Sequence, residues 1–217
     1  MTRTELDREL QRLQDQMVTL GSKVSSALEE AVDILRRQDL EAARRLIAAD
    51  RAIDEQRYGM EAHILTTIAR QQPMATDLRT LAAMLEIIAD LERIGDYAEG
   101  IAKITLLYGA EEPMPPIPQI PKMLQKSREM LDRALEAFLE GDVEAARAIP
   151  AEDDIVDALY NEVNQILLDM MLEDPKKTEQ TNLLLWAAHN LERSADRVTN
   201  ICERVVFTVT GDMHELD

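Results

Sequence analysis

The chain has 217 residues, 46% of them apolar, and its 42 acidic against 24 basic residues give a net charge of -18. Nucleic-acid phosphates and anionic membrane surfaces would repel this charge, which argues against a nucleic-acid-binding or directly membrane-binding protein. Cations or basic protein surfaces are the expected binding partners. The single cysteine, Cys202, cannot form an internal disulfide, and helical spacing predicts that it packs in the core.

The start of the chain is charged and has no apolar stretch of the kind found in signal peptides. No apolar run approaches the roughly 20 residues of a membrane-spanning helix. We therefore expect a cytoplasmic protein that meets a membrane only indirectly, through partners.

Three long helices are expected in the first half. Apolar residues spaced alternately three and four apart predict a helix that ends just before Asp39. Asp39 has the position of an N-cap, so a second helix is expected to run from there to about Gln72. Pro73 allows only a turn or a helix start, and a third helix is predicted over about 76–108.

A proline-rich segment divides the chain. Five of the eight prolines fall in 113–121, which predicts a stiff, extended linker that cannot be helical. Beyond it, helices are expected over about 122–140, 143–172 and 177–209. Pro150 should kink or delay the second of these.

The two halves also share short stretches of sequence. "DLEAAR" at 39–44 returns as "DVEAAR" at 142–147, and "LERIGD" at 91–96 returns as "LERSAD" at 191–196. Such a repeat indicates two structurally equivalent units. The sequence thus predicts an all-α protein of two tandem three-helix bundles, with boundaries 1–110 for the first bundle, 111–121 for the linker and 122–217 for the second bundle.

Pairs of acids four residues apart recur in both halves. Residues at this spacing share one helix face, so each pair places like charges where they repel by a few tenths of a kcal/mol. On the second helix, Asp50, Asp54 and Glu61 share a stripe with Ile47 and Leu65, and we expect them to face the core.

Position along the helices determines whether the pairs can meet. In each half, the midpoint between the two acid pairs is the turn that joins their helices, at Pro73 in one half and between Asp174 and Pro175 in the other. Antiparallel helices of equal rise then bring four carboxylates level. The first acid set is Asp50, Asp54, Glu92 and Asp96, and the second acid set is Asp153, Asp157, Glu192 and Asp196.

Grouped carboxylates are costly to bury unless cations neutralise them. Arg93 and Arg193 point about 100° away from the neighbouring glutamates, which makes them poor partners for the pairs. All-oxygen sites suit hard cations such as magnesium, manganese and calcium, and also iron. His63 and His189 stand in no ExxH arrangement with the acids, and Trp186 is interpreted as a packing residue.

An isolated ExxxD pair on an acidic helix is usually no more than a solvated face, whereas four such pairs, level in two repeats, favour metal binding. The stretches that contain these acid pairs resemble the PhoU proteins, accessory regulators of phosphate-specific ABC transport. They are "QQPMATDLRTLAAMLEIIADLERIGDYAEGIAK", "AADRAIDEQRYGME" and "NLERSADRVTNICERVVFTVTG". The resemblance covers nearly the whole chain. It implies tandem three-helix bundles, often assembled as homodimers, and multinuclear metal clusters of iron, zinc, manganese or magnesium held by paired E(D)xxxD motifs. The implied ligands are both acid sets, together with Asn200 and Glu203, which match the family's "NIxE" continuation.

The function implied by the resemblance is negative regulation rather than catalysis. Family members restrain the phosphate transporter, with its ATPase component as a partner, and keep a phosphate-sensing histidine kinase from activating the starvation response. The first half departs from the pattern, with Gly100 and Lys103 where the second half has Asn200 and Glu203, so we predict unequal metal sites.

Two other functions remain as alternatives. A carboxylate-bridged multinuclear metalloenzyme could use paired ions to activate water, although histidine ligands and catalytic signatures are missing from the sequence. A purely structural helical scaffold would bind no metal at all.

Overall fold

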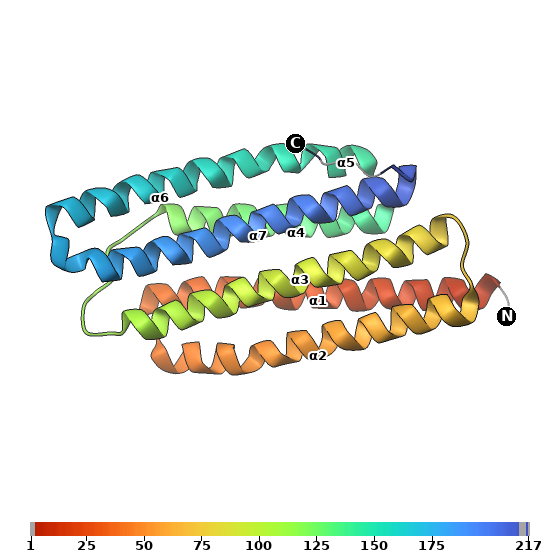
Figure 1. Ribbon diagram of the computed structural model, residues 1–217, viewed down its shortest axis with the longest axis horizontal. Helices are drawn as coiled ribbons and strands as arrows, with labels where there is room; N and C mark the ends of the chain where they lie inside the picture. The colour runs from red at the N-terminus through yellow and green to blue at the C-terminus, as the bar shows by residue number, and fades with distance from the viewer. Residues whose placement is uncertain (1–2, 213–215, 217) are drawn as a thin grey trace.

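The computed structural model describes residues 3–212 and 216, and the described chain consists of long helices without strands (Figure 1). The helices of the first half are α1 (Arg3–Arg37), α2 (Leu40–Gln71) and α3 (Thr76–Tyr108). Those of the second half are α4 (Gln119–Glu140), α5 (Val143–Ala148), α6 (Asp153–Glu173) and α7 (Thr178–Thr210), with short 3-10 turns at Pro150–Glu152 and Pro175–Lys177. The predicted all-α fold of two tandem three-helix bundles is confirmed.

Aspartates start the equivalent helices of the two halves in the same way. The Asp39 carboxylate accepts a hydrogen bond from the Ala42 amide at 2.9 Å, and Asp142 does the same for Ala145 at 3.0 Å. Each bond satisfies an amide that has no partner within its helix. The predicted N-cap at Asp39 is confirmed, and the repeated sequence at Asp142 produces the same cap.

Prolines shape the second half in two ways. Pro150 interrupts the predicted fifth helix, which divides into α5 and α6 around a 3-10 turn. The expectation that no part of 113–121 is helical is wrong, because α4 already begins at Gln119 and contains Pro121. Proline is tolerated in the first turn of a helix, where its missing N–H would have no helical partner.

The linker before α4 is held against the end of the first helix. The Gln38 side chain donates to the carbonyl oxygens of Gly109 and Glu112 at 3.0 and 2.7 Å and accepts from the Met114 amide at 3.1 Å. Side-chain bonds of this kind replace the regular backbone bonds that an extended proline-rich segment lacks.

The two bundles pack against each other along their length. In Figure 1, α2 and α6 lie on opposite outer sides, with α1, α3, α4 and α7 between them. The most extensive helix–helix contact joins α3 to α7, which run in opposite directions. Buried apolar side chains of both halves form one continuous core, which includes Leu20, Leu91, Leu131 and Leu191. Cys202 is fully buried in it, as predicted.

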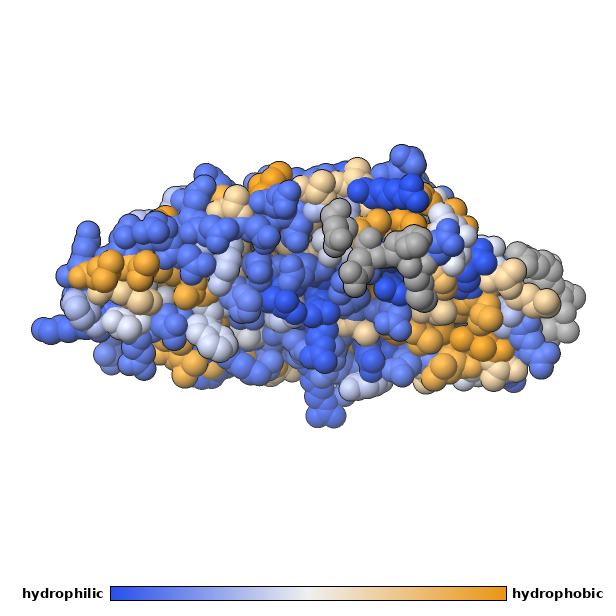
Figure 2. All heavy atoms as spheres, turned by 45° about the horizontal axis from the view of Figure 1, so that its top comes forward, coloured by the Kyte–Doolittle hydropathy of each residue, from blue (hydrophilic) through white to orange (hydrophobic). Residues whose placement is uncertain are grey.

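Apolar side chains also remain on the surface. On the face in Figure 2 they gather near the two ends of the molecule, while the middle is mainly hydrophilic. Trp186 was expected to pack inside, yet its side chain is 60% exposed on α7. Composition could not predict this, because the helix face on which a residue lies depends on the neighbouring helices. None of the described helices has the length and apolar character of a membrane span.

Candidate metal sites

Three acids of the first set meet where α2 passes α3. Asp50 and Asp54 from α2 and Asp96 from α3 each offer a carboxylate oxygen, and these oxygens lie within 4.8 Å of one another. Gly95 permits this approach, since a Cβ there would lie 3.3 Å from the Ile53 side chain and 3.5 Å from the Asp50 carboxylate. The three oxygens could bind one cation together or bridge two.

Repulsion and partial burial act on these acids together. Burial, and after it the charges of Glu99, Asp54 and Asp96, together raise the pKa of Asp50 to about 6. Burial is also the main reason why the pKa of Asp96 is raised. A cation among the three carboxylates would relieve this repulsion.

Glu92 lies one turn from Asp96, outside the group of three. Its pKa is raised by burial and then by the Asp96 charge, while Arg93 and Arg57 lower it. The Arg57 guanidinium pairs with Glu61 at 2.9 Å and lies 4.7 Å from the centre of the Tyr58 ring. The first site therefore has a fixed positive charge at its Glu92 end.

The arginines next to the motifs do find partners, so the expectation that they pair poorly with both acids is wrong for the aspartates. Arg93 Nη1 lies 3.2 Å from the Asp96 carboxylate, and Arg193 Nη1 lies 3.0 Å from that of Asp196. The arginine and aspartate are three residues apart, which places them on neighbouring positions of one helix. Exposed pairs of this kind contribute about 1 kcal/mol or less.

A cleft of about 550 Å³ opens beside the first acid set between α1, α2 and α3. Asp50 and Glu99 line it, with Lys23 from α1 and Arg45 from α2. Glu99 also forms an ion pair with Lys103, the residue that replaces Glu203 of the second half. The cleft gives solvent and ions access to Asp50.

The second acid set gathers between α6 and α7. Burial, and after it the charges of Asp196, Asp157 and Glu192, together raise the pKa of Asp153 to about 7. Asp153 Oδ1 and Glu192 Oε2 are buried and accept no hydrogen bond from the described residues. Buried acceptors without partners cost about 1–3 kcal/mol each, so this donor set fits a bound cation.

The acids lie at the edge of the core rather than facing it. The buried positions of α2 include Ala43, Ile53 and Ile64, whereas Asp50 and Asp54 are only half-buried and Leu65 is 51% exposed. The expectation of core-facing acids is wrong. Because α2 is an outer helix, the residues it buries lie on a different stripe from the one that carries Asp50, Asp54 and Glu61. Edge positions leave the carboxylates accessible to ions.

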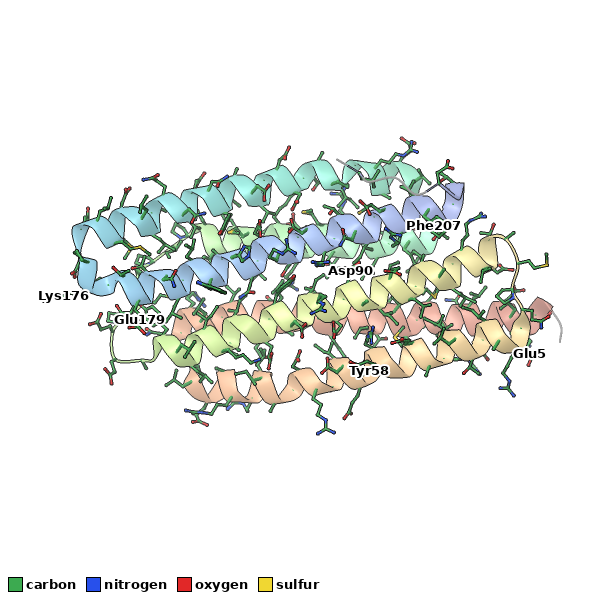
Figure 3. All side chains as sticks on the ribbon, viewed as in Figure 1. Glu5, Tyr58, Asp90, Lys176, Glu179 and Phe207 are labelled. Carbon is green, nitrogen blue, oxygen red and sulfur yellow. The ribbon has the colours of Figure 1, made fainter. Side chains whose placement is uncertain are left out.

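Asn200 and Glu203 have contacts elsewhere. Asn200 Nδ2 donates to Asp90 Oδ1 of α3 at 3.4 Å, and Glu203 Oε1 accepts from the Leu216 amide at 3.3 Å. Asp90 lies between α3 and α7, as Figure 3 shows. The described bonds of both residues are thus outside the second acid set.

Residue spacing missed two neighbours of the sites. Glu99 makes the largest charge contribution to the raised pKa of Asp50, and His189 Nδ1 lies 3.2 Å from Glu192 Oε2. The signal for each was a spacing of three residues, Asp96 to Glu99 and His189 to Glu192. His189 and Glu192 form an HxxE pattern, whereas the ligand pattern of di-iron carboxylate proteins is ExxH.

Two helical repeats with equivalent acid sets are a distinctive combination, and comparison with known proteins identifies it. A family model described as "PhoU domain" matches the chain twice, over residues 17–105 and 120–205. The chain belongs to the PhoU family. The resemblance inferred from the sequence is thereby confirmed.

The relatives of this chain match it over most or all of their own length. The chain is 33% identical to a phosphate-specific transport system accessory protein PhoU homolog of Clostridium acetobutylicum, covering 100% of both chains. It is 30% identical to PhoU of Escherichia coli over 95% of this chain and 86% of that protein. The crystal structure of the phosphate transport system regulatory protein PhoU from Streptococcus pneumoniae superposes with a TM-score of 0.90 at 30% identity, covering 97% of this chain and 100% of that one. PhoU from Pseudomonas aeruginosa gives 0.88 at 28% identity, with 95% and 99% covered.

Proposed function

We propose that this PhoU protein is a negative regulator of high-affinity phosphate uptake and of the phosphate-starvation response. It acts in the cytoplasm, as a homodimer, by contacting the ATPase component of the phosphate ABC transporter and a phosphate-sensing histidine kinase. The observation that carries the proposal is family membership over the whole chain, with relatives named as accessory proteins of phosphate-specific transport. The role is regulatory and non-catalytic.

Metal ions belong to the same proposal. The two acid sets hold iron, zinc, manganese or magnesium, and the bound ions stabilise the surface that the partners contact. Support comes from the carboxylate oxygens of Asp50, Asp54 and Asp96, which converge within 4.8 Å. Buried oxygens of Asp153 and Glu192, which accept no hydrogen bond from the described residues, also support it. Hard cations prefer such oxygen donors.

The regulatory role is tested by deleting the gene in its host and following a phosphate-starvation reporter in phosphate-rich medium. We expect the reporter to be switched on, and the wild-type gene to restore repression. A reporter that stays silent in the deletion strain contradicts the proposed regulation.

Metal binding is tested separately on the full chain by elemental analysis of purified protein. Asp50→Asn with Asp96→Asn should remove ions from the first site, and Asp153→Asn with Asp157→Asn from the second. Asp15→Asn and Asp169→Asn are matched controls, because both aspartates are exposed and bonded to a glutamine four residues earlier. Unchanged metal content in both double variants would favour the purely structural scaffold.

Activity measurements address the metalloenzyme alternative. Metal-loaded protein should show no turnover of phosphoesters above that of the site variants. Hydrolysis that depends on both the ion and the acid sets would favour an enzyme instead.

In the deletion strain, the double variants should restore less repression than Asp15→Asn does.

A further inference from the structure

His189 lies beside the second acid set, at a position where the first half has an alanine. Its Nδ1 atom lies 3.2 Å from Glu192 Oε2, one turn along the same face of α7. Although they are this close, the carboxylate oxygen accepts no hydrogen bond and is buried. In the neutral tautomer that carries its proton on Nε2, Nδ1 and the carboxylate oxygen each have a lone pair that a cation can accept.

The separation of the two atoms suits shared coordination. Ligand nitrogen and oxygen atoms lie about 2.0–2.2 Å from a zinc ion, and at angles between octahedral and tetrahedral two such ligands are about 3.0–3.4 Å apart. The 3.2 Å between His189 Nδ1 and Glu192 Oε2 falls within that range. No rearrangement of the helix is required to bring them to one ion.

A second aromatic ring packs against the imidazole. The Tyr160 ring of α6 packs against the His189 ring, with centroids 5.9 Å apart and planes inclined by 39°. The imidazole is still 48% exposed, so an ion can reach it from solvent. Asp153, whose Oδ1 is also buried without a hydrogen bond, is on the same helix as Tyr160.

The first half differs at both equivalent positions. Ala89 corresponds to His189, by the offset that relates the "LERIGD" and "LERSAD" motifs, and Arg57 corresponds to Tyr160, by the offset that relates the two Asp pairs. Arg57 brings a permanent positive charge near Glu92, where it lowers the pKa of that acid. The first half thus repels an additional ion at this end, whereas the second has an imidazole there.

We propose that His189 is a nitrogen ligand of the second site, which therefore binds a transition ion such as zinc or iron(II), while the first site remains all-oxygen. Imidazole raises the preference of a site for these ions over magnesium and calcium. The inference rests on the proposed metal binding of the acid sets. It adds a ligand and a metal class for one of them.

The test uses the full chain with Asp50→Asn and Asp96→Asn, so that the second site is the one examined. Zinc is loaded, its stoichiometry is measured by elemental analysis, and its ligands are identified by X-ray absorption at the zinc edge. We expect imidazole scattering, its loss in His189→Ala, and a zinc dissociation constant at least about tenfold higher, since even outer partners of metal ligands cost that much. Magnesium affinity should stay unchanged.

His63→Ala is the matched control, because His63 is paired with Glu9 at 2.8 Å in the first half. This variant should keep the imidazole signal, and circular dichroism should show full helix content in every variant. If zinc binds without imidazole scattering, or if the scattering persists in His189→Ala, His189 is not a ligand. Either result leaves the proposed metal binding of the acid sets standing. If no zinc binds even the chain with both acid sets intact, the proposed metal binding fails as well.

Discussion

Asp90 Oδ1 of α3 accepts a hydrogen bond from Asn200 of α7. Ten residues later on α3 and ten residues earlier on α7, a Cβ added at Gly100 would lie 3.2 Å from Asn190. Asp90 and Asn190 are equivalent residues of the repeat, as are Gly100 and Asn200. The two halves thus meet through a pair of antiparallel, internally related helices. Glycine at position 100, where the second half has Asn200, thus has a packing reason that does not depend on metal chemistry.

Arg197→Met should destabilise the contact between α3 and α7. Arg197 Nη1 lies 3.5 Å from Asp90 Oδ1. Without the arginine, the mostly buried Asp90 carboxylate keeps the hydrogen bond from Asn200 but loses its positively charged partner. We expect a loss of about 1–3 kcal/mol in the free energy of unfolding at pH 7, measured by urea denaturation. Burial already raises the pKa of Asp90, so the loss should shrink at pH 5, where this carboxyl is more readily protonated.

The control for that experiment is Arg204→Met. Arg204 pairs with its neighbour Glu203 on the same helix, and this variant should change stability by about 1 kcal/mol or less. A loss for Arg197→Met that grows at pH 5 would contradict the role assigned to Asp90.

Gly100→Asn places in the first half the residue that the second half has. Because a Cβ at Gly100 is already within 3.2 Å of the Asn190 amide, a larger side chain should cost about 1–3 kcal/mol through overpacking. Asn190→Ala should recover part of that cost. A double-mutant cycle by chemical denaturation measures the coupling, and strictly additive effects would show that the two residues do not share this space.

The stability of the metal-free chain should depend on pH through its acid sets. Asp50 and Asp153 have pKa values of about 6 and about 7, raised mainly by burial from an ordinary 3.8, so the folded state binds more protons than the unfolded state in this range. Their contribution is therefore present near pH 4 and is lost as the pH rises to about 7. With chelator present, Asp50→Asn with Asp153→Asn should flatten the decline seen in urea titrations of the wild type.

Added metal should reverse that trend. Cations bind the ionised carboxylates, so stabilisation by metal should grow from pH 5 to pH 7.5 in the wild type and be much smaller in the double variant. Equal slopes for the two metal-free proteins would show that these aspartates titrate in the same way folded and unfolded.

The two repeated N-caps should contribute alike. Asp39→Ala and Asp142→Ala each remove a side-chain acceptor from a helix amide and should each cost about 1 kcal/mol, measured by thermal and urea unfolding. Glu41→Ala and Glu144→Ala are the matched controls in the first turns of the same helices. Controls as damaging as the cap variants would mean that first-turn charge, rather than capping, supports these helices.

Local patterns in the sequence were sufficient for the helices and their repeat. The third helix begins and ends where predicted, because Pro73 and Gly109 bound a long apolar period. Asp50, Asp54 and Asp96 come together because their distance from the turn is similar along two antiparallel helices, which is a property of the sequence alone. The start of α4 was misplaced by three residues, since proline in a first helical turn is compatible with a helix.

Only the tertiary structure decided what each helix face meets. The contact of α3 with α7 joins residues more than 100 positions apart, and it turns Asn200 toward Asp90 and explains Gly100 by the approach of Asn190. It also leaves Trp186 exposed and His189 beside Glu192. Periodicity fixes which residues share a face, whereas the burial and partners of that face depend on helices distant in the chain.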